Sequence, residues 1–461
     1  MIIIDDTLTP GDLAEGIDRL WRLSGTKIRR LAERWDPADG APVFTVEGRY
    51  VNRGWTEWTQ GFVYGAGLLQ FDATGDEWAL EFGRTGTREH MGGHVTHVGV
   101  HDHGFNCVST YGNLRRLMAE GRLPENADEK AFLDMALASS GAVQAARWTD
   151  LGGGRGYIPS FNGPHSLFVD TMRSLRSLAV AHLLGRALKG EHDQSISLLD
   201  RLAAHAAVTA ETTVFFGKGR DAYDEWGRTC HEAVFNVNDG LYRCPSSQQG
   251  YSPFTTWTRG QAWITLGYAE QLEFFQALKA AGRPEADAYG DLVDIMTACA
   301  QATADHYIAN TPTDGVCYWD TGAPGLAAMP GHRDRPADPY NDHEPVDSSG
   351  AAIMAQGLLR LASVLENEGE AAAARRYRQA GLTIARSLLT ATYLSEDEDH
   401  EGLLLNAIYH RPNGWDHVPS GRKVPCGESC QWGDYHFREL ALMIARDAAG
   451  EAPYRFFTGL L

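Results

Sequence analysis

Apolar residues along this chain recur at helical spacing, whereas the strict alternation of apolar and polar residues that is typical of strands is scarce. In the clearest case, a stripe of apolar residues runs on from Arg259 until Gly282 and Pro284, which end the helix. The same pattern predicts twelve helices. They span about 10–36, 59–73, 76–88, 105–120, 127–146, 166–187, 191–211, 258–281, 285–308, 348–366, 370–391 and 433–448.

The twelve helices divide into six pairs, because only the second helix of each pair opens with a cluster of aromatic and polar residues. The clusters are WTEWTQGF (55–62), HDHGF (101–105), HSLFVD (165–170), TTWTRGQAW (255–263), PVDSSGAA (345–352) and CQWGDYHF (430–437). A toroid of inner and outer helices would produce this alternation, since the N-terminal ends of its inner helices meet at one mouth. We therefore expect an all-α toroid, a single domain over residues 1–461, with its function at that mouth.

Length and charge exclude several classes of protein. The 461 residues carry 41 Lys and Arg against 60 Asp and Glu, a formal net charge of −19. A surface this acidic repels phosphates and anionic lipid, so we expect neither nucleic acid nor a membrane as a partner. The opening residues MIIIDDTLTPGDL lack the profile of a secretory signal, and seven scattered Cys fit reduced thiols. These features predict a cytoplasmic protein and leave its oligomeric state open.

Signatures of metal and cofactor chemistry are weak. The chain has no Walker lysine loop and no dinucleotide-binding glycine motif, and HEAVF (231–235) has Phe where a zinc protease needs its second His. Five His from His90 to His103 have spacings that could collect a metal, and Cys426 with Cys430 could hold zinc, but neither set has the further ligands that complete a site. We therefore expect no metal and no organic cofactor.

Asp102 and Asp170 form a stronger candidate site than the metal-ligand sets, since both stand at the opening of a predicted inner helix among apolar residues. A helix-capping role would be ordinary for each of them. If the two carboxylates instead face each other, burial and mutual repulsion split their pKa values, so that one is charged and the other can act as a general acid near neutral pH. The positive end of each helix opposes the neutral form, so burial has to dominate.

A possible sugar-binding pair lies on the next inner helix. Arg259 and Trp263 are four residues apart and share a helix face, which places a cation beside an indole. A bound sugar acid needs a donor for its carboxylate and a flat apolar surface for its ring. The alternative is an arginine stacked on a core tryptophan. Gln249, just upstream, adds an amide on the approach.

Taken together, the clusters closely resemble the unsaturated glucuronyl hydrolases, glycoside hydrolase family 88. The run QGYSPFTTWTRGQAW (249–263) is similar to the signature of that family. Further similar runs follow in the family's order over about residues 58–440. They are WTQGF (58–62), HDHGF (101–105), FVDTMRSL (168–175), DGVCYWD (314–320), VDSSGAA (346–352) and WGDYHF (432–437).

The resemblance implies an (α/α)6 barrel and an enzyme that acts on oligosaccharides with a 4,5-unsaturated uronic acid at the non-reducing end, as polysaccharide lyases leave it. Asp170 then corresponds to the general acid and base, which is uncharged at rest, protonates C4 and activates the water that adds at C5, after which the hemiketal opens. Asp102 corresponds to a second carboxylate that holds sugar hydroxyls and tunes Asp170. Implied substrate-binding residues are Trp58, His101, Phe105, Trp148, His231, Gln249, Arg259 and Trp263.

Three alternatives stay open. A related rhamnogalacturonyl hydrolase would keep the barrel and act on unsaturated galacturonyl-rhamnose. A sugar-binding toroid would bind without turnover, and an inverting glycosidase would cleave saturated glycosides. The run SGRKVPCGESC (420–430) does not fit the Ser and Lys pattern associated with sulfate recognition in the family, which speaks against sulfated substrates.

Overall fold

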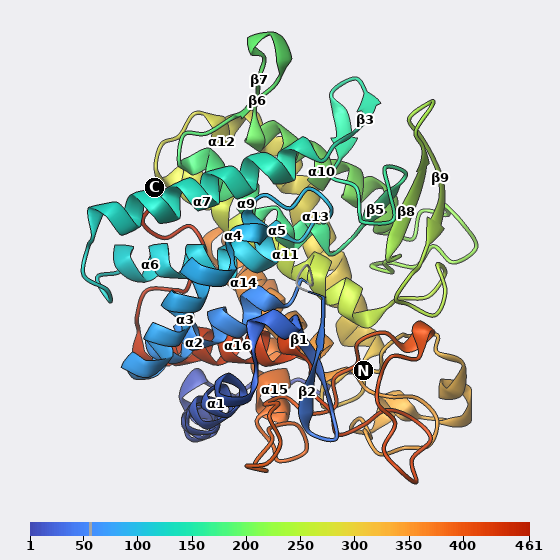
Figure 1. Ribbon diagram of the computed structural model, residues 1–461. Coiled ribbons are helices and arrows are strands. Elements are labelled where there is room, and N and C mark those ends of the chain that lie inside the picture. The colour runs from blue at the N-terminus through green and yellow to red at the C-terminus, as the bar shows by residue number, and fades with distance from the viewer. Residues whose placement is uncertain (55–57) are drawn as a thin grey trace.

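The computed structural model describes residues 1–54 and 58–461, and it is mainly helical (Figure 1). The first three residues of the predicted cluster at 55–62 lie outside the described residues. The α-helices are α1 (Ala14–Arg34), α2 (Gln60–Thr74), α3 (Glu77–His90), α4 (Gly92–Val95), α5 (His103–Cys107), α6 (Asn113–Ala119), α7 (Ala127–Ala146), α8 (Thr171–Ser174), α9 (Arg176–Leu183), α10 (Leu198–Thr213), α11 (Thr258–Ala280), α12 (Glu285–Ala288), α13 (Gly290–Asn310), α14 (Ser348–Asn367), α15 (Ala371–Leu388) and α16 (Gln431–Ala449).

The strands are short and lie in the connections between helices. They are β1 (Ala41–Val46), β2 (Arg49–Arg53), β3 (Thr149–Gly152), β4 (Arg155–Tyr157), β5 (Ser166–Phe168), β6 (Leu188–Lys189), β7 (Ser195–Ile196), β8 (Glu232–Asn236) and β9 (Leu241–Ser246). All pairs are antiparallel, as the hairpins β1–β2, β3–β4 and β6–β7 and the three-stranded sheet β5–β8–β9. In Figure 1 the β8–β9 ribbon stands at one side of the helices.

Each of the twelve predicted helices has a counterpart, which confirms the helical reading of the apolar pattern. Two of them differ in a way that matters for the site. The helix predicted at 166–187 starts only at Thr171, because Ser166–Phe168 pair with β8 as a strand. The helix predicted at 105–120 is broken into α5 and α6 by a π-helical turn, η3 (Val108–Gly112). π-turns of this kind are frequent at functional sites.

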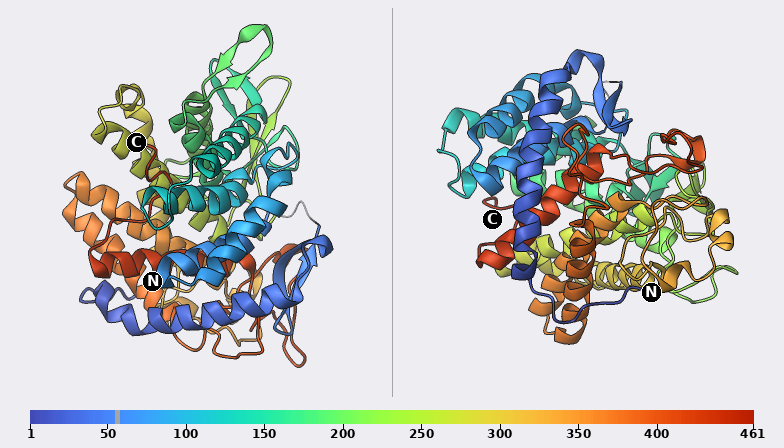
Figure 2. Two further views of the ribbon diagram at one scale, coloured as in Figure 1. Left: turned by 60° about the vertical axis from the view of Figure 1, so that its left-hand side comes forward. Right: turned by 90° about the horizontal axis from the view of Figure 1, so that it is seen from below.

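Six helical segments contact one another in a closed circuit that follows the chain. α2 contacts α5 and η3, α5 contacts α8, α8 contacts α11, α11 contacts α14, α14 contacts α16, and α16 returns to α2. Helices that are not members of this circuit pack against it, as α3 does on α2, α13 on α11 and α15 on α14. Figure 2 shows α1 lying across α16 in the same way. The N-terminal ends of the six segments carry the predicted clusters.

One helix, α14, is long and apolar enough by composition to cross a membrane, among the residues that the structure describes. In the fold, 89% of its apolar stretch is buried inside the protein, and it packs against α11, α15 and α16. A helix that is apolar all round is expected at the centre of a large helical protein. α14 is therefore a core helix of this fold.

Candidate active site

Two acids at helix starts do not cap their helices. An acid in this position usually accepts hydrogen bonds from first-turn N–H groups, as Asp347 does from Ser349 and Gly350 at the start of α14. Asp102 and Asp170 hold the same position on α5 and α8, yet neither side chain makes a capping hydrogen bond, and both are buried. The capping alternative is thereby excluded for both acids, and their carboxylates are available for other contacts.

Gly104 allows the helices that carry these acids to meet. A side chain at this position would place its Cβ 2.4 Å from the backbone oxygen of Ser174 and 2.5 Å from its Cα. The Gly104 N–H donates to the Ser174 hydroxyl at 2.9 Å, and this hydroxyl donates to the carbonyl of His101 at 2.5 Å. As a result, a carboxylate oxygen of Asp102 lies within 4.8 Å of one of Asp170.

His101 lies between the two acids. Its Nε2 is 3.0 Å from Oδ2 of Asp170 and 3.7 Å from Oδ1 of Asp102, and only 1% of the residue is exposed. Burial alone would lower the pKa of His101, but the two carboxylates outweigh it and raise the pKa. His101 therefore bonds directly to Asp170 and lies close to Asp102 without a hydrogen bond to it. The substrate-binding role predicted for His101 stays a prediction.

The His231 ring approaches the second carboxylate oxygen of Asp170. Its Nδ1 accepts the backbone N–H groups of Gln248 at 3.1 Å and Gln249 at 3.2 Å, so Nδ1 carries no proton. The proton of the ring must then reside on Nε2, which lies 3.7 Å from Oδ1 of Asp170. The tautomer of His231 is set by the backbone of the 248–249 segment.

The pKa values of the two acids diverge, as predicted, but in the opposite sense to the one expected for Asp170. Burial raises the pKa of Asp102, and the charge of Asp170 adds to this effect against the attraction of His101. Burial acts on Asp170 in the same direction, yet the hydrogen bond from His101 and the nearby His231 outweigh it and hold the pKa of Asp170 well below its usual range. In the unliganded protein Asp170 is ionised, and Asp102 is the acid that more readily keeps a proton.

Three predicted aromatic residues form one cluster beside the acids. The half-buried Trp58 meets Phe105 edge-on, with ring centroids 5.5 Å apart, and Phe105 meets Trp263 at 5.0 Å. Trp58 also stacks on Trp432 at 4.9 Å. Phe105 and Trp263 are almost wholly buried, so they form the inner part of this cluster. Trp58 is the member of the three that has exposed surface for a sugar ring.

The structure corrects the role predicted for Arg259. This side chain is 1% exposed, and it pairs with Asp347 at 2.5 Å. Its guanidinium also donates to the carbonyl groups of Ile408 and Tyr409 and to the amide oxygen of Gln249. A guanidinium with these partners is not an open anion site. Arg259 instead holds the backbone of residues 408–409 in place. Gln249 links Arg259 to His231, because its side-chain oxygen accepts from Arg259 and its backbone N–H donates to His231.

Trp148, which was predicted to contact the substrate, lies apart from the acids, whereas Phe161 lies against His101. Trp148 packs against Gly156 and under the guanidinium of Arg201, 3.9 Å from its ring, and no described contact joins it to the acids. Phe161, in the connection between β4 and β5, is 53% exposed and lies parallel to the His101 ring at 6.0 Å. Nothing in the sequence marks Phe161, because a lone Phe between Ser and Asn resembles any loop residue.

Arg147 is a second residue that sequence reasoning missed. It ends α7, and its guanidinium donates to the carbonyl groups of Val98, Pro159 and Ser160. Its charge lowers the pKa of Asp102 against the larger effect of burial. Arg147 therefore joins the segment before His101 to the one before Phe161 and places a cation near the acid pair.

Two of the histidines considered as metal ligands make hydrogen bonds to other side chains. His94 bonds to Gln60 at 2.6 Å, and His103 bonds to Ser140 at 2.9 Å, so these rings serve as hydrogen-bonding groups. In the described part of the chain, the side chains close enough to share an ion are His101, Asp102 and Asp170. The direct hydrogen bond of His101 to Asp170 gives this group a geometry suited to proton transfer.

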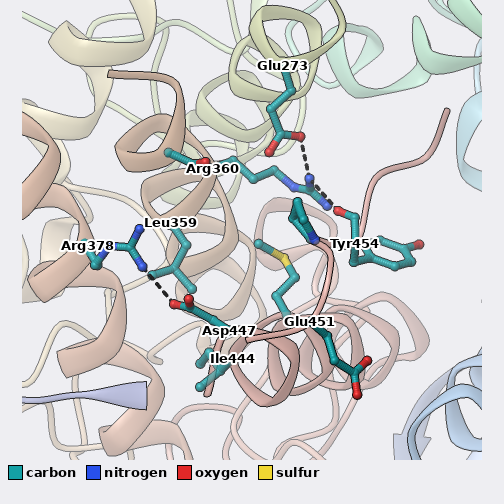
Figure 3. Close-up of a pocket in the computed structure, with 11 residues that line it drawn as sticks. Glu273, Leu359, Arg360, Arg378, Ile444, Asp447, Glu451 and Tyr454 are labelled. Carbon is teal, nitrogen blue, oxygen red and sulfur yellow. Dashed lines mark hydrogen bonds and ion pairs between the residues drawn. The ribbon is translucent and has the colours of Figure 1, made fainter. Parts of the chain in front are cut away.

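A pocket of about 240 Å³ lies away from these acids, among the C-terminal halves of α11, α14 and α16 (Figure 3). Its buried cation Arg360 is paired with Glu273 at 2.6 Å and donates to the carbonyl of Tyr454. Arg378 on its wall is likewise paired with Asp447 at 2.7 Å. Because its charged groups satisfy one another, this pocket has no group placed for chemistry. The candidate site is the acid pair.

A closely spaced pair of buried carboxylates with histidines and aromatic rings on a helical fold is the arrangement of a glycoside hydrolase, and this is the class of the protein. No protein-family model matches the chain. Curated relatives do: the unsaturated glucuronyl hydrolase of Bacillus sp. strain GL1 is 27% identical over 420 residues, 87% of this chain and 90% of the relative. The unsaturated chondroitin disaccharide hydrolase of Streptococcus agalactiae is 23% identical over 409 residues, 85% of this chain and 82% of the relative. The chain is thus a homologue of the unsaturated glucuronyl hydrolases, as its motifs indicated.

Solved structures agree on the fold. The crystal structure of the unsaturated glucuronyl hydrolase from Bacillus sp. GL1 matches with a TM-score of 0.68 at 23% identity, covering 92% of this chain and 97% of that one. A structure described as an unsaturated glucuronyl hydrolase specific for heparin matches with a TM-score of 0.69 at 18% identity, covering 95% and 98%.

Proposed function

We propose that this protein hydrolyses oligosaccharides whose non-reducing end is a 4,5-unsaturated uronic acid, by hydrating the C4=C5 double bond. The observation that carries the proposal is the uncapped pair Asp102 and Asp170 with His101 between them. A vinyl ether needs one well-placed proton and one activated water, which a carboxylic acid can supply in turn. The likeness to relatives named for unsaturated glucuronyl and chondroitin substrates supports the same substrate class.

Because Asp170 is ionised in the unliganded protein, it must gain a proton before it can protonate the substrate. The substrate is an anion, and its carboxylate beside Asp170 raises the pKa of that acid through like-charge repulsion. The protons held near Asp102 and His101 then have a lower-energy position on Asp170. Asp170 gives its proton to C4, and the carboxylate so formed takes a proton from the water whose oxygen adds at C5. The hemiketal that results opens and releases the neighbouring sugar.

We also propose the barrel architecture that the sequence predicted. The closed circuit of six helical segments, with further helices packed on its members, supports an (α/α)6 barrel. A single domain over residues 1–461 and a cytoplasmic location stay predictions, as do roles in substrate binding for Trp58, His101, His231 and Gln249.

One of the alternatives is disfavoured by a distance. Inverting glycosidases keep their two carboxyl groups roughly 6.5–9.5 Å apart to admit a water molecule. Oxygen atoms of Asp102 and Asp170 lie within 4.8 Å, which is too close for that arrangement. The proposed function is tested with a panel: unsaturated glucuronyl disaccharides, unsaturated galacturonyl-rhamnose and saturated disaccharides. Loss of ultraviolet absorbance with the first substrates alone supports the proposal, whereas turnover of saturated sugars, or binding without turnover, would contradict it.

We expect Phe161→Ala and Trp148→Ala to separate a substrate contact from a packing contact. Loss of the exposed ring over His101 should raise KM by about threefold to tenfold, the range of one aromatic contact, with little change in melting temperature. Loss of Trp148, which packs on Gly156 and Arg201, should lower the melting temperature and leave KM within about twofold. Steady-state kinetics and thermal unfolding of both variants measure this. The reverse pattern would restore the substrate-binding role to Trp148.

Asp102→Asn is expected to stabilise the fold at neutral pH while it slows catalysis. The pKa of Asp102 is raised above 3.8 in the folded protein, so ionising this acid costs stability once the pH exceeds the unfolded value. Asparagine removes that cost. The melting temperature should therefore rise by about 1–3 °C at pH 7.5 and change less at pH 4, where the native acid keeps its proton. Thermal unfolding at both pH values checks this, and an equal change at both would contradict the pKa direction.

A further inference from the structure

An aromatic ladder leads from the acid pair to the protein surface. From Trp58 the rings continue through Trp432, and then to Tyr409 at 4.9 Å and Trp415 at 5.3 Å. Trp415 is 38% exposed, and the guanidinium of Arg53 lies over its ring at 4.3 Å. The outer end of the ladder is thus an exposed indole with a cation stacked on it.

A second arginine that stacks on a tryptophan, Arg29 on Trp78, differs from Arg53 in its ion pairing. Arg29 lies 4.5 Å over the ring of Trp78, which is 39% exposed, but both terminal nitrogens of Arg29 bind Asp76 at 2.8 and 2.9 Å. Arg53 has the same stacking geometry, yet no carboxylate among residues 1–54 and 58–461 lies within 4.0 Å of it. A stacked guanidinium keeps its in-plane N–H groups available for a planar anion.

The segment that presents Trp415 is held in place by the core of the protein. Arg259 binds the carbonyl groups at 408 and 409 from inside, and Asp416 accepts the N–H of His410 at 3.0 Å. The His410 ring packs on Trp415 at 4.8 Å. Burial lowers the pKa of His410 to about 4, and the positive charges of Arg259 and Arg53 add to this effect. The segment that carries Trp415 is therefore held in place before any ligand binds.

We propose that Arg53, stacked on Trp415, binds an anionic group, a carboxylate or a sulfate, on a sugar at the leaving side of the substrate. This inference rests on the function proposed above. The reacting uronate must lie against Asp170, beside His101 and Trp58. Trp432 and Tyr409 are buried, so the exposed indole of Trp415 at the far end of these rings is placed for another sugar of the substrate and not for the uronate itself. In a chain of net charge −19, a guanidinium with no carboxylate partner in the described part of the chain gives a local attraction for a second negative charge.

The test compares three unsaturated substrates on the full-length protein: a glucuronyl–N-acetylhexosamine disaccharide with an uncharged leaving sugar, the same disaccharide with a 6-sulfate, and a tetrasaccharide with a second uronate. Arg53→Gln should lower kcat/KM by about fivefold on an anionic substrate and by less than about twofold on the neutral one, and added salt should weaken the difference. Arg53→Lys should recover part of the loss. The arm that responds, sulfate or second uronate, identifies the source of the anion.

The matched control is Arg29→Gln, which removes a guanidinium from an exposed indole elsewhere and should leave the ratio between anionic and neutral substrates unchanged. Equal effects of Arg53→Gln on all three substrates, or none on any, would overturn the inference while leaving the proposed function in place. If the unmodified protein turns over none of the three, the proposed function itself fails and this inference fails with it.

Discussion

Asparagine at position 170 is expected to reduce kcat by about 10³-fold to 10⁴-fold, because the amide can neither deliver a proton to C4 nor accept one from water. KM should change much less, since the amide keeps the shape of the side chain and can still contact His101 and His231. The measurement is the decay of absorbance of the conjugated enol ether at substrate concentrations well above and below KM. This is the larger of the two catalytic effects expected from the acid pair, since Asp102 acts through Asp170.

The control for this variant is Asp128→Asn, the same chemical change in the exposed first turn of α7. It should leave kcat unchanged, and circular dichroism should be the same for both variants and the unmodified protein. More than a tenth of the normal kcat in Asp170→Asn would remove Asp170 from the proton-transfer role. Partial activity that disappears in the double variant with Asp102→Asn would assign the proton to the pair.

Arg173→Met is expected to cause the largest loss of stability, about 3–5 kcal/mol in the free energy of unfolding. The side chain is fully buried and pairs with Glu439 at 2.6 Å and Glu270 at 3.3 Å, and it also contacts Nε2 of His436. Removing the cation leaves the buried Glu439 without its ion-pair partner and leaves Glu270 with only its longer contacts to Arg176 and Arg360, at 3.5 and 4.0 Å. Denaturant unfolding, followed by fluorescence, measures the change.

Two further variants decide whether the loss comes from an unpaired charge. Arg376→Gln removes a surface pair with Asp305 and should cost less than about 1 kcal/mol. Arg173→Met combined with Glu439→Gln should be more stable than Arg173→Met alone, because it removes a charge that has lost its partner. If the double variant is less stable than the single one, the shape of the side chains matters more than their charge.

The helices were predictable because they are long and their apolar periodicity is strong, and all twelve are present. The boundaries that mattered most were not predictable. Ser166–Phe168 read as the start of a helix, yet they pair with β8, a strand 64 residues further along that begins at Glu232. Local pattern carries no information about such a partner, because tertiary pairing decides whether a short apolar run becomes strand or helix.

Asp102 and Asp170 could be picked out of the sequence because both stand at the opening of a predicted inner helix among apolar residues. The candidate site was not predictable where the answer depends on side-chain partners in space. Arg259 looked like an open cation, but Asp347 and two carbonyl groups from residues 408–409 occupy it. The state of Asp170 was misjudged for the same reason, since the sequence does not show that His101 and His231 both point at one carboxylate.

The close approach at Gly104 has a consequence for redesign. Because α5 and α8 touch through their main chains at Ser174, the separation of the two acids is a property of the helix axes and cannot be tuned by exchanging the acids. Lengthening a side chain to glutamate would alter reach without creating the wider gap that direct displacement at an anomeric carbon needs. Conversion of this scaffold to ordinary glycoside cleavage would therefore have to begin with a bulkier residue at the helix crossing and a repacked interior.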